Sequence, residues 1–198
     1  QQLVGAAENP PVLEARFKLR FGAEEIELIR PVIHRYVDRL RGELTRPFVI
    51  APGIALRFSE PVLILPGSQR RKFEVVVRGS VAGVSGEVTL DAPKGWKIEP
   101  AVRKFQLGEA GQEHTLSFEA AAAAGAAQGW VRATAVHGSQ RISSGIEVIA
   151  HPHIRTQTVF PAAEVRAVRV DAAVLAKNIG YVAGAGDEVP QALRQLGC

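Results

Sequence analysis

Alternation of apolar and charged residues is the clearest pattern in this chain. It is most regular over residues 13–21, whose apolar members are Leu13, Ala15, Phe17, Leu19 and Phe21. A period of two places these side chains on one face of a β-strand. The apolar run 26–37 follows after a short polar stretch, and we expect the two to form a hairpin in which Pro31 favours an edge position. Residues 1–52 are therefore interpreted as the end of a preceding β domain, with residues 38–53 as its polar, Pro- and Gly-punctuated connection to the next one.

Short apolar segments separated by turn residues recur through residues 53–150. The predicted strands are 54–58, 62–65, 72–78, 84–90, 103–107, 114–119, 129–137 and 140–149. This spacing is typical of an antiparallel, Ig-like β-sandwich, so the fold class is mainly β. We expect the inward side chains of 72–78 to pair in register with those of 84–90. The predicted core consists of Phe73, Val75, Val77, Val84, Val88, Leu90, Phe105, Leu107, Leu116, Phe118, Ile142, Ile146 and Val148.

Residues 151–198 are interpreted as a linker and the start of a truncated α/β domain. A strand over 177–183 and a Gly-rich turn are expected to precede a helix that begins near Asp187 and ends at Gly197. One strand and one helix cannot bury their own apolar faces, so we expect this βα unit to lack its sheet. Its exposed strand would then invite pairing with the sandwich edge or with another chain.

Charge and hydropathy narrow the classes of partner. The chain has 198 residues and a net charge of +4, and the excess is spread along its length, which argues against a nucleic-acid surface. The densest basic cluster consists of Arg70, Arg71 and Lys72. We interpret it as solvent-exposed residues where a turn enters a strand, rather than as an anion-binding site. No apolar stretch is long enough for a membrane span, and the single cysteine, Cys198, cannot form an internal disulfide.

Few residues of this chain suggest a metal site or an anion-binding site. His151 and His153 lie one residue apart, which on an extended segment would aim both imidazoles to one side, as two zinc ligands require. A third ligand from His34, His114 or His137 cannot be placed from sequence, so we expect no metal site and no cofactor and keep the histidine pair as an alternative. The run Gly184–Glu188 could cradle a phosphate, but its two acidic residues would repel an anion.

Trp96 and Trp130 are candidate sugar-binding residues, because an aromatic face suits the apolar side of a pyranose ring. Burial against the sandwich core is the alternative for both. It is favoured for Trp96 and evenly balanced for Trp130, whose neighbours Arg132 and Thr134 share its face.

Three stretches together resemble the region that follows the catalytic domain in large bacterial LmbE/PIG-L-like deacetylases. They are Gly42-Glu43 with Arg46-Pro47, then Gly86–Leu90 with Pro93–Trp96 and Pro100, and finally Ile179–Pro190. The middle stretch also looks like the Ig-like domains that accompany galactose-binding modules in some glycosidases. In the deacetylase family a zinc-bound water in an N-terminal α/β domain hydrolyses an N-acetyl group, and an amidotransferase-like domain follows the β region. The resemblance implies a periplasmic or secreted location.

None of the family's catalytic residues carries over to this chain. Ala150-His151-Pro152 matches the start of the zinc motif A-H-P-D-D-E, but His153 and Ile154 stand where its aspartates belong. We therefore expect a region without enzymatic activity that serves as a scaffold and contacts other domains of the same parent chain. The alternative is a carbohydrate-binding module that brings the enzyme to a glycan, and the second alternative is the metal site at His151 and His153.

Overall fold

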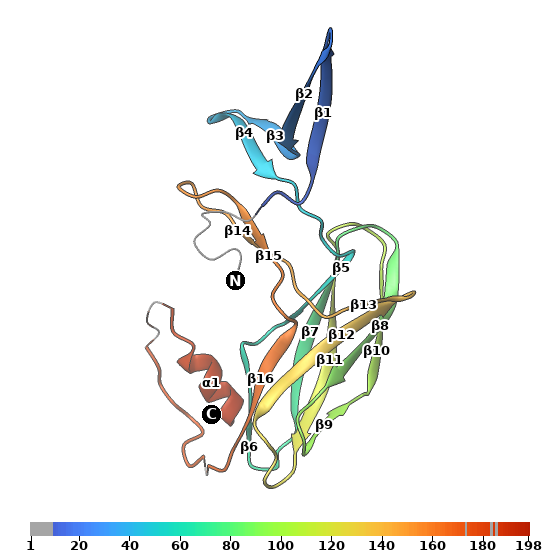
Figure 1. Cartoon of the computed structure of the whole chain (residues 1–198). Helices are drawn as coiled ribbons and strands as arrows, with labels where there is room; N and C mark the ends of the chain where they lie inside the picture. Colours follow the sequence, from blue (N-terminus) through green and yellow to red (C-terminus); the bar gives the residue numbers. More distant parts are fainter. Residues whose placement is uncertain (1–9, 173, 183, 185) are drawn as a thin grey trace. The chain divides into compact units, whose positions relative to one another are not determined.

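The structure, a computed structural model, describes residues 10–172, 174–182, 184 and 186–198 (Figure 1). It is mainly β, with a short helix near the C-terminus. The chain divides into two compact units. The first combines residues 1–51 with 147–159, and the second combines residues 52–146 with 160–198.

The second unit is a β-sandwich of two sheets. One sheet has the order β5-β7-β11-β9, formed by β5 (Ile54–Phe58), β7 (Arg71–Gly79), β11 (Glu113–Ala122) and β9 (Trp96–Glu99). The other has the order β10-β8-β12-β16-β6, formed by β10 (Val102–Leu107), β8 (Val84–Asp91), β12 (Gly129–His137), β16 (Glu164–Val170) and β6 (Val62–Pro66). The first order matches the A-B-E-D sheet of the immunoglobulin fold, and β8-β12-β16 matches C-F-G. The predicted Ig-like β-sandwich is confirmed.

The core lies between these sheets and is built by the inward half of each alternating strand. Phe73, Val75 and Val77 of β7 are buried, and so are Val84 and Val88 of β8. The predicted pairing of these two strands is nevertheless wrong. β7 hydrogen-bonds to β11, and β8 belongs to the opposite sheet. The two sets meet across the interior, because a period of two specifies which face is buried but not which strand lies alongside.

The last strand of the sandwich is interrupted. Both β13 (Gln140–Ile142) and β16 pair with β12, at successive stretches of it. Between them the chain leaves and returns through a stem in which the Ala163 N–H donates to the Ser143 carbonyl at 2.8 Å and the Gly145 N–H donates to the Pro161 carbonyl at 2.8 Å. The sequence predicted a single strand over 140–149, whereas the structure divides this range between the two units.

The middle of this excursion belongs to the first unit. There β14 (Glu147–Ile149) pairs with β15 (Gln157–Val159). Val148, predicted to be a core residue, is 56% exposed on β14. The apolar residues over 140–149 do lie partly in strands, β13 and β14, but these are two separate strands. The one that carries Val148 does not belong to the sandwich.

Residues 151–198 differ from their predicted role as a linker followed by a new domain. β16 is an internal strand of the sandwich sheet, antiparallel to β12 and parallel to β6. The expected strand over 177–183 is absent from 177–182, and residue 183 lies outside the described part of the chain. The expected helix is present as α1 (Val189–Leu196), which ends at Gly197 with φ 93°. Asp187 caps it from one residue further out, accepting from the Val189 N–H at 2.9 Å.

Besides the β14–β15 pair, the described residues of the first unit form two hairpins. β1 (Glu14–Phe21) pairs with β2 (Glu24–Pro31) across a two-residue turn in which Gly22 has φ 64°, so the predicted N-terminal hairpin is confirmed. Its second strand is shorter than the predicted run 26–37, because it ends at Pro31 and a new strand begins at Ile33. β3 (Ile33–Asp38) pairs with β4 (Gly42–Pro47), so the expected connection 38–53 contains a strand. None of the described residues in this unit is buried. The unit therefore has paired strands but no apolar core of its own.

Candidate functional site

The two candidate metal ligands lie in the loop between β14 and β15. The segment is not extended as expected, because the Ile154 N–H donates to the His151 carbonyl at 3.2 Å and Pro152 occupies the first inner position of the resulting turn. The imidazoles of His151 and His153 stack on one another, with ring centroids 5.8 Å apart and planes inclined by 21°. Both side chains are exposed.

A metal centre would need further ligands beside this pair. Within the described ranges, no group of three or more His, Cys, Asp or Glu side chains gathers where it could hold an ion. His34 stacks on Tyr36 at 5.5 Å in the first unit, while His114 and His137 stand on sandwich strands. The His137 Nδ1 atom lies 2.6 Å from the Ser85 carbonyl oxygen. His34, His114 and His137 thus each stand in a local environment of their own.

Trp96 is held by the protein itself. Its indole N–H donates to the Ala127 carbonyl at 2.8 Å, and the ring packs against the sandwich core. Gly95, with φ 88°, places its backbone so close to Ala126 that a Cβ there would lie 2.9 Å from the Ala126 Cα. The loop before β9 therefore packs closely against Ala126. The indole N–H of Trp96 already has a hydrogen-bond partner within the protein.

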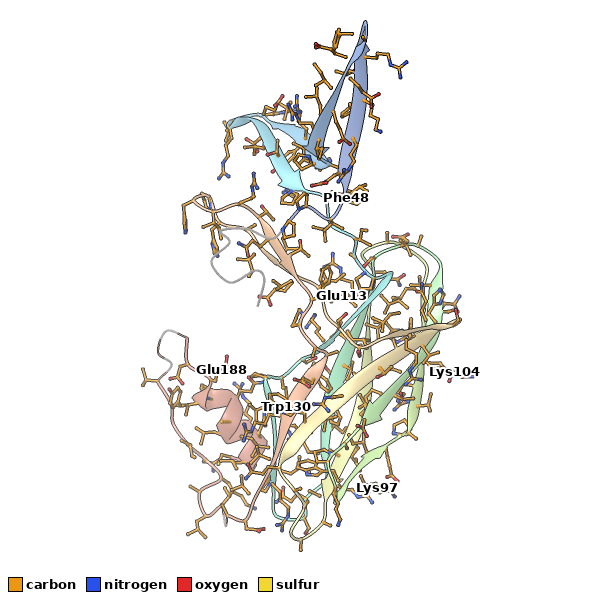
Figure 2. The ribbon with its side chains drawn as sticks, viewed as in Figure 1. Phe48, Lys97, Lys104, Glu113, Trp130 and Glu188 are labelled. Atoms are coloured by element: carbon orange, nitrogen blue, oxygen red, sulfur yellow. The ribbon has the colours of Figure 1, made fainter. Side chains whose placement is uncertain are left out.

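Trp130 is open to solvent. It stands on β12 (Figure 2), and 44% of the residue is exposed to solvent. Its cross-strand partner on β16 is Arg166. The inward neighbour Val131 is fully buried, so the indole points away from the core onto the outer face of the sheet. Of the two tryptophans, Trp130 is the one available to a ligand.

The outward residues beside Trp130 are polar. We define the Trp130 face as the outward residues Trp130, Arg132, Thr134, Thr89, Asp91, Glu164 and Arg166, which the strand register places side by side. Arg132 is central, because it lies opposite Asp91 on one side and opposite Glu164 on the other. Its Nε donates to a Glu164 carboxylate oxygen at 2.9 Å. The Trp130 face thus combines one exposed indole with hydroxyl, guanidinium and carboxylate groups on the outer side of β8, β12 and β16.

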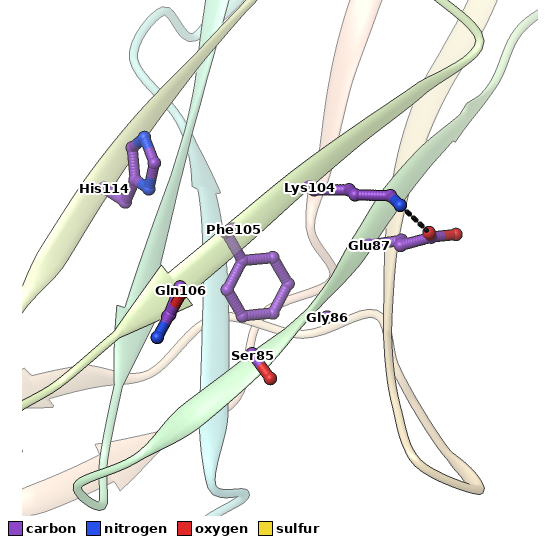
Figure 3. A pocket seen from close by; sticks show the side chains of 7 residues that line it. All are labelled: Ser85, Gly86, Glu87, Lys104, Phe105, Gln106 and His114. Carbon is purple, nitrogen blue, oxygen red and sulfur yellow. Dashed lines mark ion pairs between the residues drawn. The ribbon is translucent and has the colours of Figure 1, made fainter.

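A shallow hollow of about 540 Å³ lies against β8 and β10, with His114 of β11 also in its lining (Figure 3). It is lined by Ser85, Gly86, Glu87, Lys104, Phe105, Gln106 and His114. The Lys104 Nζ and Glu87 Oε1 atoms are 3.7 Å apart at its rim. Sequence reasoning did not single out this place, because its residues come from three strands whose neighbourhood only the tertiary structure sets.

Two arginines of the basic cluster at the start of β7 pair with glutamates, Arg71 with Glu60 and Arg70 with two others. The Arg70 guanidinium donates to Glu99 at 3.1 Å and to Glu119 at 3.0 Å, and these two carboxylates are cross-strand partners on β9 and β11. The Lys97 ammonium, followed by Arg70, holds the pKa of the Glu99 carboxyl below its usual range. Both carboxylates also raise the pKa of the Arg70 guanidinium. The expectation that this cluster is a strand entry rather than an anion site stays a prediction.

The Gly-rich run before α1 shows no special role. Its described members are Gly184 and Gly186–Glu188, and residue 185 lies outside the described part of the chain. The Asp187 carboxylate is engaged with the first turn of the helix. A phosphate approaching this turn would meet that negative charge.

No family model matches this chain, and no curated protein matches it. The relationship to LmbE/PIG-L-like deacetylases therefore stays an expectation from the sequence. The structure contributes one further finding on partners: among the described residues, every helical segment is too short or too polar to reach across a lipid bilayer.

Proposed function

We propose that this chain is an accessory β-sandwich region without catalytic activity, of the kind that follows the zinc-dependent domain in LmbE/PIG-L-like deacetylases. In this role the sandwich is a rigid platform that fixes the attachment of neighbouring domains of the same parent chain. The sequence resemblance supplies the family context, and the fold supplies the physical argument.

The observation that carries this proposal is the interruption of the last sandwich strand. Because β13 and β16 both pair with β12, the excursion between them is anchored at both ends in one rigid sheet. The chain passes between the two units near residues 51, 146 and 159. Three covalent passages restrict the freedom of an attached unit more than one linker does, since each closed loop removes conformations. These three chain passages therefore support a role for the sandwich as a platform that restricts the movement of an attached domain.

Shortening the excursion tests this role. In the test variant, a Gly-Ser linker replaces residues 147–159 and leaves the stem at Ser143 and Ala163 intact. We expect the melting temperature of the sandwich to stay unchanged, while the segment 10–51 becomes more sensitive to limited proteolysis. A matched control replaces the exposed loop 109–112, which lies within the sandwich. Equal protease sensitivity of the intact and shortened proteins would contradict the platform role.

Hydrolysis assays test the absence of activity. The intact protein, with and without added zinc, is incubated with N-acetylated sugars and with activated amides and esters. We expect rates equal to those of the heat-denatured protein. Reproducible turnover that is lost on substitution of His151 would overturn the proposal in favour of a metal site.

A second function is favoured by the Trp130 face, and we propose it as an alternative: binding of a glycan by this surface. The exposed indole supplies a stacking platform, and Arg132, Thr134 and Asp91 supply hydrogen-bonding groups around it. Isothermal titration calorimetry with a panel of oligosaccharides at millimolar concentration tests it. Trp130→Ala is expected to abolish the heat of binding and Trp96→Phe to retain it. Absence of heat with every sugar would eliminate this function.

A further inference from the structure

The hairpin of β1 and β2 has one apolar face that is open to solvent. The antiparallel register places four cross-strand pairs on this side: Ala15 with Arg30, Phe17 with Leu28, Leu19 with Ile26, and Phe21 with Glu24. Phe17 is 51% exposed, Phe21 64% and Ile26 46%. An isolated two-stranded hairpin is at best marginally stable in water, so this face requires something to cover it.

The opposite side of the hairpin is charged and internally balanced. Ion pairs join Arg16 to Glu27 at 3.7 Å, and join Lys18 and Arg20 to Glu25 at 3.8 Å each. Residues 14–31 contain four basic and four acidic side chains in total. A balanced hairpin is not drawn to an anionic membrane or to a nucleic acid, because both select a net positive charge. The partner must therefore be recognised by the apolar face itself.

The apolar face is complementary to a second copy of itself. Consider two hairpins packed face to face about a two-fold axis that runs across the strands, midway along the face. This operation places Phe21 of one copy over the small Ala15 of the other, and Leu19 over Phe17. It also places Glu24 over Arg30, at both ends of the face. At each end of the face the large Phe21 meets the small Ala15, and each Glu24 carboxylate meets an Arg30 guanidinium. The face is therefore self-complementary, as an isologous interface requires.

We propose that two copies of this chain associate through the β1–β2 hairpin, with their apolar faces in contact and their strands related by this two-fold axis. Eight residues per strand give a face about 27 Å long. Such a ribbon is small beside the roughly 800 Å² per partner of a standard interface, so the association is weak and depends on protein concentration. It adds a self-association surface to the platform role and does not depend on that role.

Sedimentation velocity of the intact protein over a concentration series tests the proposal. The intact protein is expected to shift from monomer to dimer as its concentration rises. Glu24→Arg and Arg30→Glu each place like charges together at both ends of the interface, and each is expected to weaken dimerisation by about tenfold or more. The double variant restores both opposite-charge contacts and is expected to regain the original affinity within about threefold.

Glu25→Arg is the matched control, because it makes the same substitution on the charged side of the same turn. It breaks two intrachain ion pairs but leaves the apolar face untouched, so dimerisation should be unchanged. Nuclear magnetic resonance of the hairpin amides checks that each variant keeps the strand register. A protein that remains monomeric throughout the series would overturn the proposal. So would a double variant that stays as weak as the single ones, or equal weakening by Glu25→Arg.

Discussion

The side-chain amide of Gln195 occupies the place of a neighbouring strand beside Ile64. Its oxygen accepts from the Ile64 N–H at 2.8 Å, and its nitrogen donates to the Val62 carbonyl at 2.9 Å and to Glu60 at 3.1 Å. β6 is the edge of its sheet, and an open edge is a template for unwanted pairing. Helix α1 thus blocks this edge with one carboxamide, which is 5% exposed.

Removal of this amide should destabilise the sandwich. Gln195→Leu leaves the Ile64 N–H and the Val62 carbonyl without their partner, which costs about 1–3 kcal/mol. Gln195→Glu should cost at least as much, because a carboxylate cannot donate to Val62 and would repel Glu60. Urea unfolding measures both effects. Gln191→Glu, the same change in the first turn of α1, is the control and should be neutral or slightly stabilising. If all three variants were as stable as the parent protein, the docking of α1 on β6 would be contradicted.

Gly86 should not tolerate a side chain. A Cβ at this position would lie 2.1 Å from the Val136 carbonyl oxygen and 3.0 Å from the Phe105 ring. Gly86→Ala therefore has to displace backbone, and we expect a loss of about 1–3 kcal/mol or more in the free energy of unfolding. Gly53→Ala is the control, since its nearest neighbour would be a Val81 methyl at 3.7 Å. A Gly86→Ala protein with the parent melting temperature would contradict the close approach of β8 and β12.

The two units should respond differently to loss of a phenylalanine. Phe118 is 1% exposed in the sandwich core, and Phe118→Ala is expected to cost about 3–5 kcal/mol in thermal or urea unfolding of the sandwich. Phe21 is 64% exposed on the hairpin of the other unit, so Phe21→Ala should leave the sandwich transition in place. Tryptophan fluorescence reports this transition, because Trp96 and Trp130 both lie in the sandwich. A large shift with Phe21→Ala would mean that the units unfold as one.

The Glu99 carboxyl should titrate below its usual range. Lys97 is the main cause and Arg70 the second, so Lys97→Met should raise the Glu99 pKa more than Arg70→Met does. Carbon-13 NMR titration of the glutamate carboxyls measures both shifts. Because the pKa is depressed in the folded protein, the stabilisation is present above the pKa of the unfolded chain. It is lost as the pH falls through the folded pKa, so both variants should flatten the acid limb of the stability profile. The reverse order of the two shifts would contradict this arrangement.

The sequence alone determined most strands and the side of each that is buried. Alternation over 13–21 predicted β1 and its hairpin, and the bounds 54–58 and 129–137 coincide with β5 and β12. This succeeds because side-chain direction alternates along any strand whatever lies beside it. The same rule identified Phe73 and Val88 as core residues without placing them in the correct sheets. Of the candidate site residues, Trp130 could be named as an aromatic that is either buried or exposed, but its cross-strand partner Arg166 on β16 and the polar residues of β8 beside Arg132 and Thr134 could not.

Tertiary structure decided which strands are neighbours, and that choice rests on contacts distant in sequence. The run 164–170 looked like a linker, because nothing local shows that β12 and β6 lie on either side of it. Nothing in the local sequence marks Gln195 as a buried residue, because only the unpaired edge of β6 gives its amide a reason to be buried. Local pattern sets the conformation of a segment and its apolar face, whereas hydrogen-bond partners depend on how the chain crosses between sheets.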